Sequence, residues 1–261
     1  MPTGLHLPYV AFFGRTLAEY LDMFCISLDQ LREGSTLDCP SGPDSFVAEA
    51  CAAGCDAVGC DPMYAYPPDE LRTRGLANLD ESFVHIDAQR AALTFRDYPA
   101  FKQAKYDAIA RFSDDYALHY GRGRYVAASL PKLAFADASF HRVLAANFLF
   151  TYAHQDFGGL YEGREFDLAF HLQSIDELAR VTRSEIRLSP MGSFASPPRP
   201  HDYRDATIAR LQQLGFRTEL VASNFDSGLA AFNDVLIARR IERAHEARAW
   251  SELPTNQGTT A

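Results

Sequence analysis

Short apolar runs alternate with amphipathic stretches along most of the chain. The alternation is clearest over residues 35–61, where an apolar run ends at Asp38 and a turn rich in Pro, Ser and Gly follows. A helix-like stretch at 45–53 comes next, and a second apolar run ends at Asp61. This order predicts a strand, turn, helix and strand, with the turn placing free backbone N–H groups at the carboxyl end of a strand.

The same alternation continues beyond this unit. Further strands are predicted at residues 125–128, 142–146, 185–188, 216–222 and 232–239. Helices separate the first five strands, which predicts a mostly parallel sheet with helices on both faces. About nine residues join the last two strands, too few for a crossover, so we expect this pair to be an antiparallel hairpin.

Residues 1–34 predict a helical N-terminal extension. Thr16 with Glu19, and Ser27 with Gln30, have the spacing of two capping boxes. The preceding segment YVAFFGR, residues 9–15, crowds aromatic side chains beside a cation. It has two interpretations: the aromatic rings seat the extension on the core, or the segment is a lid that touches a ligand.

Residues 62–124 are too long for a single crossover helix. They predict an insertion over about 62–98, with an inserted helix near 68–90, followed by a crossover helix near 99–119. Asp202 is placed to cap a later helix that ends at Leu214. The main domain is therefore expected to span residues 35–240, and residues 241–261 are expected to form a C-terminal helix and a loose tail.

Composition narrows the class of partner. The 261 residues carry a net charge of -9, which argues against nucleic acid, because phosphate binding draws on clustered Lys and Arg. The chain has neither a membrane-spanning run nor a signal-like N-terminus, so we expect a soluble, cytoplasmic protein. Cys51 and Cys55 lie four residues apart, but no His lies near them, and we expect no metal site.

Four stretches, taken in order, resemble the class I S-adenosylmethionine (SAM) dependent methyltransferases. DCPSGPD at 38–44 is similar to the acid-x-Gly-x-Gly-x-Gly turn, with Pro40 and Asp44 in place of the outer glycines. VGCDP ends in the acid of the second strand, and LAFADASFHRVLAANFLF and ELARV with SEIRLSP are similar to later parts of the family pattern. The resemblance covers about residues 35–240. It implies a seven-stranded Rossmann-like sheet that ends in an antiparallel hairpin.

The resemblance also implies a binding site for SAM. Asp61 would hold the ribose hydroxyls, Met63 would lie against the adenine, and Ser129 stands where many members hold the adenine amine with an Asp. The residues expected to contact the cofactor are Asp38, Pro40, Ser41, Gly42, Asp61, Pro62, Met63, Ser129, Leu130 and Asn147. Asp44 has two interpretations: it caps the following helix, or it points inward and repels the carboxylate of SAM.

The predicted function is methyl transfer from SAM to a small-molecule acceptor by in-line displacement. Such a reaction needs positioning and exclusion of water, and a base only for a weakly nucleophilic acceptor. The candidate bases are His141, His154, His171, His201, Tyr20 and Tyr152, of which His154 and Tyr20 are preferred. The acceptor pocket is expected from the extension, the insertion and the Pro-rich loop at 196–200. Two alternatives are a non-catalytic SAM-fold scaffold and an NAD-dependent oxidoreductase, although the latter would require Gly-x-Gly-x-x-Gly after the first strand.

Overall fold

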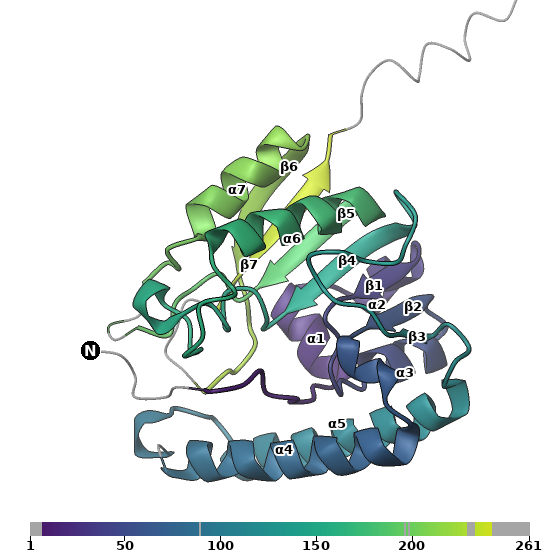
Figure 1. The fold of residues 1–261 in the computed structure, drawn as a ribbon, viewed down its shortest axis with the longest axis vertical. Coiled ribbons are helices and arrows are strands. Elements are labelled where there is room, and N and C mark those ends of the chain that lie inside the picture. The colour runs from purple at the N-terminus through teal and green to yellow at the C-terminus, as the bar shows by residue number, and fades with distance from the viewer. Residues whose placement is uncertain (1–6, 89, 196, 198, 229–232, 242–261) are drawn as a thin grey trace, which may run out of the picture.

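A single seven-stranded sheet organises the chain (Figure 1). The structure is a computed structural model that describes residues 7–88, 90–195, 197, 199–228 and 233–241. The strands are β1 (Thr36–Asp38), β2 (Ala57–Cys60), β3 (Tyr125–Val126), β4 (Phe140–Ala146), β5 (Thr182–Ser189), β6 (Phe216–Ala222) and β7 (Asp234–Arg240).

The strand order is β3-β2-β1-β4-β5-β7-β6. The first five strands pair in parallel, whereas β7 is antiparallel to both β5 and β6. The predicted parallel core and terminal hairpin are therefore confirmed. The third strand is shorter than predicted, with two residues, and β4 begins two residues early, at Phe140.

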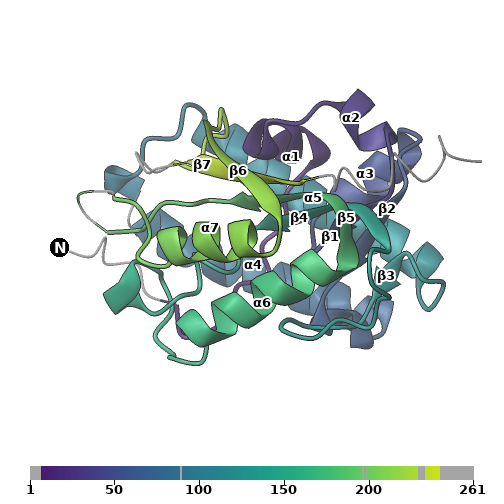
Figure 2. The same cartoon turned by 90° about the horizontal axis from the view of Figure 1, so that it is seen from above.

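Helices cover both faces of the sheet (Figure 2). They are α1 (Leu17–Phe24), α2 (Leu28–Arg32), α3 (Phe46–Ala52), α4 (Pro68–Ala88), α5 (Tyr98–His119), α6 (Leu168–Val181) and α7 (Arg204–Gln213). Side chains of β4 alternate between the two faces: Val143 and Ala145 join the core with α6 and α7, whereas Leu144 and Ala146 join the core with α1, α3 and α5. This alternation places the two helical layers on opposite sides of one strand.

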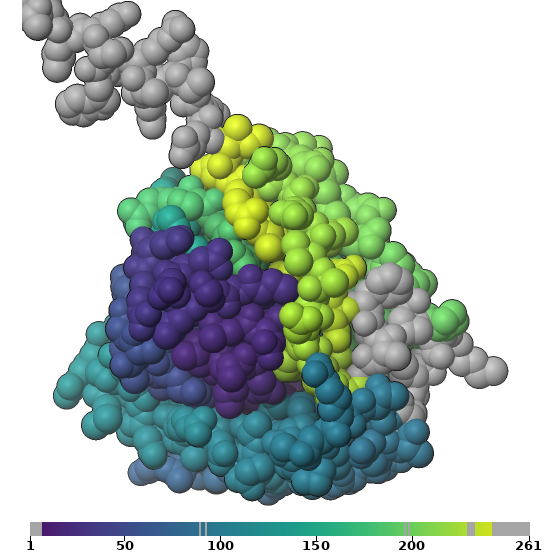
Figure 3. All heavy atoms as spheres, turned by 180° about the vertical axis from the view of Figure 1, so that it is seen from behind, coloured from purple at the N-terminus to yellow at the C-terminus, as the bar shows by residue number. Residues whose placement is uncertain are grey.

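The N-terminal extension contains the two predicted helices. Both capping boxes form, with Thr16 bound to Glu19 before α1 and Ser27 bound to Gln30 before α2. A buried cation on β5 then holds the end of α1, because Arg187 Nη1 donates to the carbonyl oxygens of Phe24 and Cys25 at 2.7 and 2.8 Å. In Figure 3 this N-terminal part, in purple, lies against the C-terminal hairpin, in yellow and green.

The insertion after β2 contains a helical pair close to the predicted bounds. A short 3₁₀ helix, η1 (Pro62–Ala65), leads into α4, and α5 returns to β3. Of the two interpretations of Asp44, the one in which it caps α3 is not met, because Ser45 is the N-cap. The predicted cap Asp202 is wrong, because Tyr203 is the N-cap of α7. The predicted C-terminal helix falls on residues 242–261, outside the described part of the chain.

Candidate ligand-binding site

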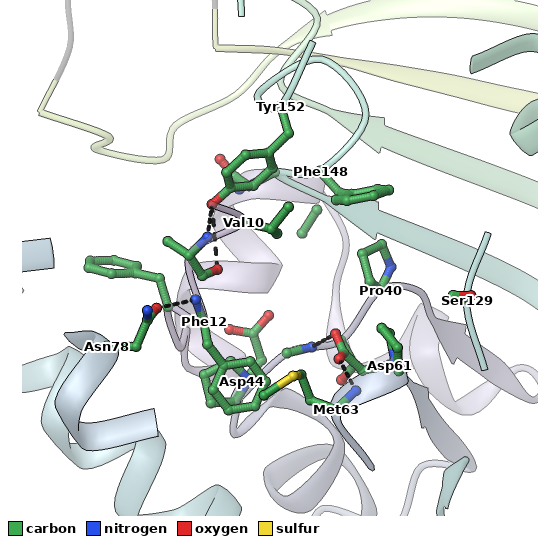
Figure 4. Close-up of a pocket in the computed structure, with 18 of the residues that line it drawn as sticks. Val10, Phe12, Pro40, Asp44, Asp61, Met63, Asn78, Ser129, Phe148 and Tyr152 are labelled. Carbon is green, nitrogen blue, oxygen red and sulfur yellow. Dashed lines mark hydrogen bonds between the residues drawn. The ribbon is translucent and has the colours of Figure 1, made fainter. Parts of the chain in front are cut away.

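A cavity of about 690 Å³ opens at the carboxyl ends of β1, β2 and β4 (Figure 4). From β1 the sheet continues through β2 on one side and through β4 on the other, so the cavity lies at the point where the strand order reverses. Parallel sheets bind ligands at this point. The lining residues are 10–13, 15, 39–44, 61–63, 74, 77, 78, 81, 128–130, 146–148, 152 and 166.

The turn after β1 forms the floor of the cavity. Gly42 adopts a positive φ of 54°, which suits a residue without a Cβ. Its N–H donates to Asp61 Oδ2 at 3.0 Å, and its carbonyl oxygen accepts from Tyr64 Oη at 2.6 Å. Ser41 N–H donates to the carbonyl oxygen of Cys60 at 2.9 Å. The turn is thus fixed to the end of β2 at three points.

Asp61 connects the turn to η1. Its Oδ1 accepts from Met63 N–H at 2.9 Å, so each carboxylate oxygen accepts one backbone N–H. Burial raises the pKa of Asp61 to about 6, although the two backbone hydrogen bonds oppose this shift. An ionised carboxylate has about four lone-pair positions. Two of them are left over for hydroxyl donors of a ligand.

The structure gathers most of the predicted cofactor residues around this cavity. Every one of them lines it except Asp38, which is completely buried behind the turn. Met63 lies beside Asp61, and Ser129 lies beyond them in the loop after β3 (Figure 4). Leu130 of the same loop also lines the cavity. Asn147 adopts a positive φ of 45° directly after β4, where its N–H donates to the carbonyl oxygen of Ser189 at 2.7 Å.

A buried acidic cluster lies behind the floor. Tyr20 Oη is 3.0 and 3.1 Å from the two carboxylate oxygens of Asp38, and 2.5 Å from Asp44 Oδ2. Burial raises the pKa of Asp44 to about 7, and burial together with the nearby Asp44 raises the pKa of Asp38 well above its usual range. Asp44 also lines the cavity, so the cluster reaches the ligand space through this one residue.

Residues 7–15, which we call the strap, run extended across the cavity between α4 and the loop after β4. Ala11 N–H donates to Tyr152 Oη at 2.9 Å, and Phe12 N–H donates to Asn78 Oδ1 at 2.5 Å (Figure 4). Leu7 N–H donates to the carbonyl oxygen of Leu160 at 2.8 Å. Phe12 and Phe13 pack into clusters with side chains of α4 and α5, as the first interpretation of this segment predicts. The same two residues also line the cavity, so the segment forms one of its walls.

Arg15 ends the strap and is a lining residue that the sequence reasoning missed. Its Nη1 donates to the carbonyl oxygen of Phe13 at 3.2 Å, whereas its buried Nε has no partner in the described part of the chain. The crowding of aromatic residues beside this cation was the only signal in the sequence. Asn78 and Glu81 of α4 and Tyr152 and Phe166 after β4 also line the cavity and were not predicted as cofactor contacts.

Of the candidate bases, Tyr152 lines the cavity, whereas the two preferred ones, Tyr20 and His154, do not. Tyr20 is fully buried behind Asp38 and Asp44. His154 is also buried, and its Nδ1 accepts from Asp156 N–H at 3.1 Å as the cap of the short 3₁₀ helix η3 (Gln155–Phe157). Their placement gives no support to a role in proton transfer. No His is among the described residues that line the cavity.

Neither a metal site nor a membrane-spanning helix is found among the described residues. They contain no group of three or more His, Cys, Asp and Glu side chains arranged to hold a metal ion. None of the helices in the described ranges combines the length and apolar character that a membrane crossing requires. Of the Pro-rich loop predicted to help build the acceptor pocket, no described residue lines the cavity.

Comparison with known proteins gives likeness only at the level of structure. No protein-family model matches the sequence, and no curated protein matches it either. Magnesium protoporphyrin IX methyltransferase from Synechocystis PCC 6803, solved with SAM, is 14% identical with a TM-score of 0.44, over 86% of this chain and 81% of that one.

Two further solved structures show likeness of the same order. The 1,6-didemethyltoxoflavin-N1-methyltransferase of Burkholderia thailandensis is 14% identical with a TM-score of 0.45, over 86% of this chain and 79% of that one. An N-methyltransferase from Bradyrhizobium japonicum WM9 is 12% identical with a TM-score of 0.44, over 82% and 84%. At these identities and TM-scores, the substrates of the three proteins are not assigned to this chain. The strand order and the antiparallel β7 between β5 and β6 give this chain the fold of the class I SAM-dependent methyltransferases.

Proposed function

We propose that the protein binds SAM in the cavity and transfers its methyl group to a small-molecule acceptor. The arrangement of Asp61 carries this proposal. Its carboxylate holds the turn after β1 and the start of η1 together, at the point where the sheet reverses its strand order. A carboxylate in this place is suited to the two hydroxyl groups of a ribose.

The remaining walls suit the other parts of the cofactor. Met63 and Leu130 offer apolar side chains to an adenine ring, and the hydroxyl of Ser129 lies near them. Arg15 and Asp44 add charged side chains to the lining of the cavity. The volume of about 690 Å³ is in the range of pockets for ligands of this size.

The protein's own part in the reaction is to position the acceptor and exclude water. When bound, SAM supplies a methyl group on a positively charged sulfur. Val10, Phe148, Tyr152 and Phe166 form a largely apolar and aromatic wall around the rest of the cavity. Such a wall favours an aromatic or apolar acceptor held in line with the methyl group. Tyr152 Oη already binds the strap at Ala11, so we assign it a positioning role.

Calorimetric titration tests the proposal. We expect S-adenosylhomocysteine (SAH) and SAM to bind with micromolar dissociation constants, and NADH to give no heat of binding. Transfer of a radioactive methyl group from SAM to small molecules of a cell extract then distinguishes an enzyme from a scaffold. Binding of NADH without SAM would favour an oxidoreductase, and binding of SAM with no labelled product would favour a non-catalytic protein.

A further inference from the structure

Two charged side chains in the cavity wall have polar atoms that no neighbour satisfies. Asp44 is only 3% exposed, and its Oδ1 has no hydrogen-bond partner in the described part of the chain. The same holds for Arg15 Nε, which is buried although its residue lines the cavity. A buried polar atom without a partner is costly. An acceptor and a donor left open on one cavity indicate a ligand that carries both kinds of charge.

The charges around Asp44 come from every element packed against it. Tyr20 and Glu19 lie on α1, Asp38 ends β1, Lys105 comes from α5 and Arg15 from the strap. Lys105 is fully buried and forms an ion pair with Glu19. Asp61 adds a further carboxylate at the end of β2, and α4 contributes Arg74 and Glu81 to the outer wall of the cavity.

This set contains an excess of buried acid around Tyr20. The phenol has one proton, yet its oxygen is within 3.1 Å of both Asp38 and Asp44. One carboxylate accepts that proton, and the other comes this close only if it is itself protonated or faces another positive charge. Leaving aside Asp61, which is held by two backbone N–H groups, Arg15 and Lys105 stand against Glu19, Asp38 and Asp44, so the cluster around Tyr20 has one acid more than it has cations.

We propose that Asp44 and Arg15 bind the α-amino-acid end of the nucleoside ligand, with Asp44 Oδ1 accepting from the α-ammonium group and Arg15 donating to the α-carboxylate. This inference rests on the proposed function, because SAM and SAH both carry an amino acid on the ribose. Asp44 then does not repel the ligand's carboxylate, because Arg15 holds that group. The ammonium supplies the missing positive charge, and it replaces the proton that the acidic cluster holds in the free protein.

A pair of probes isolates the amino-acid end. SAH has it, and 5′-methylthioadenosine has the same nucleoside without it. We expect Asp44→Asn and Arg15→Gln each to weaken SAH binding by about 10- to 100-fold in calorimetric titration, as the loss of a charged hydrogen bond does. Binding of methylthioadenosine should change less than about twofold, since neither side chain touches the nucleoside in this scheme.

The control variant is Asp114→Asn, which changes an exposed carboxylate on α5 that pairs with Arg72 away from the cavity. It should leave both affinities unchanged, and thermal unfolding checks that all variants are folded. Equal losses for SAH and methylthioadenosine, or no loss for either, would overturn the inference and leave the proposed function standing. Failure of the unaltered protein to bind both probes would instead overturn the proposed function.

The dependence on pH gives a second readout. The pKa of Asp44 is raised to about 7 in the free protein, so binding below this pH must release a proton. We expect the affinity for SAH to rise about tenfold from pH 6 to pH 8. The binding enthalpy at pH 6 should depend on the ionisation enthalpy of the buffer. Asp44→Asn should reduce both effects to the smaller part that Asp61 contributes near pH 6, and an unchanged pH profile in this variant would contradict the assignment.

Discussion

Asp61 acts on the site through its backbone contacts as well as through its free lone pairs. Its two oxygens accept from Gly42 N–H and Met63 N–H, which belong to segments on either side of β2. Removal of one contact would therefore loosen the turn under the ligand, even if the other residues stayed in place. The carboxylate is 7% exposed, so water is poorly placed to replace a lost contact.

We expect Asp61→Asn to weaken SAH binding by about 10- to 100-fold. The amide keeps one acceptor but turns an NH₂ group toward a backbone N–H, and two donors cannot bond each other. Calorimetric titration with SAH measures the effect, and methylthioadenosine should lose a similar factor because it carries the same ribose. Asp56→Asn, an exposed change just before β2, is the matched control. Full affinity in Asp61→Asn would remove Asp61 from the site.

Glu185 lies at the centre of a buried ion-pair network that stabilises the sheet. Its Oε1 accepts from Arg142 Nε and Arg187 Nε, both at 2.7 Å, and its Oε2 accepts from Arg239 Nε at 3.0 Å. Arg142 and Arg187 are 2% and 1% exposed, so this carboxylate is the main counter-charge of two buried cations. The arginines in turn hold the pKa of Glu185 below its usual range, against the effect of burial.

Glu185→Gln should lower the free energy of unfolding by about 3–5 kcal/mol, because it leaves buried cations without their anion. Urea unfolding followed by circular dichroism measures this change. Glu219→Gln removes the other, exposed partner of Arg239 and should cost less than about 1 kcal/mol. The network does not line the cavity, so the affinity of folded Glu185→Gln for SAH should be unchanged. A cost as small as that of the control would show that the arginines find other partners.

At the scale of elements, the strap encloses the cavity at the carboxyl ends of the strands. It is bound on one side by Asn78 of α4 and on the other by Tyr152 after β4. It also passes close to the floor, because a Cβ built on Gly14 would lie 2.7 Å from the carbonyl oxygen of Pro43. A residue larger than glycine at this position would push the strap away from the turn.

Tyr152→Phe tests whether the strap must be held for binding. The change keeps the ring but removes the oxygen that accepts from Ala11 N–H, so the strap should open more often. We expect faster hydrogen exchange over residues 8–13, and SAH binding weaker by about three- to tenfold, the loss of one neutral hydrogen bond. Tyr161→Phe, whose hydroxyl binds the exposed Glu165, is the control. If exchange is unchanged while methyl transfer stops, Tyr152 acts on the acceptor and not through the strap.

Sequence patterns predicted the elements well because their causes are local. Capping boxes at Thr16 and Ser27 join residues three apart, and the hairpin follows from a short connection. The strap contacts could not be predicted, since they join residues 66 and 141 positions apart. The two interpretations of Asp44 stayed open for the same reason: its carboxylate binds Tyr20 from α1 and not the helix beside it.

In the site, too, residues marked by local sequence patterns were predicted, whereas residues placed by long-range contacts were not. Asp61 and Gly42 were predicted because a strand end and a turn mark them in the sequence. Arg15 was missed because its role comes from the path of the strap over the floor, and no spacing in the sequence encodes that path. Tyr20 was predicted from its chemistry, and His154 from its chemistry and its place after the fourth strand, but the fold buries both outside the cavity.

For the whole molecule, buried titratable groups give opposite dependences of stability on pH. Burial lowers the pKa of His201 to about 3 and also lowers that of His171, so these residues destabilise the fold as the pH falls below 6.5. Asp44 and Asp61 have raised pKa values, so the folded protein binds more protons than the unfolded chain between about pH 4 and pH 7. Their contribution therefore falls as the pH rises through this window. Only a difference between variants separates the two effects.

Asp44→Asn should make the ligand-free protein more stable at pH 8. The carboxyl has a pKa of 3.8 in its ordinary state and about 7 in the fold, so its ionisation costs about 4 kcal/mol above pH 7. The amide cannot ionise, and it keeps an oxygen that can accept from Tyr20 Oη. We expect a gain of this size in urea unfolding at pH 8 and none at pH 4, where the native carboxyl is protonated. Asp114→Asn should show no gain at either pH.

A gain at pH 8 together with the loss of SAH affinity would mean that the acid which recognises the ligand destabilises the empty site, as is common for binding residues. Destabilisation at pH 8 would instead show that Arg15 and Lys105 already balance the ionised carboxylate without a ligand.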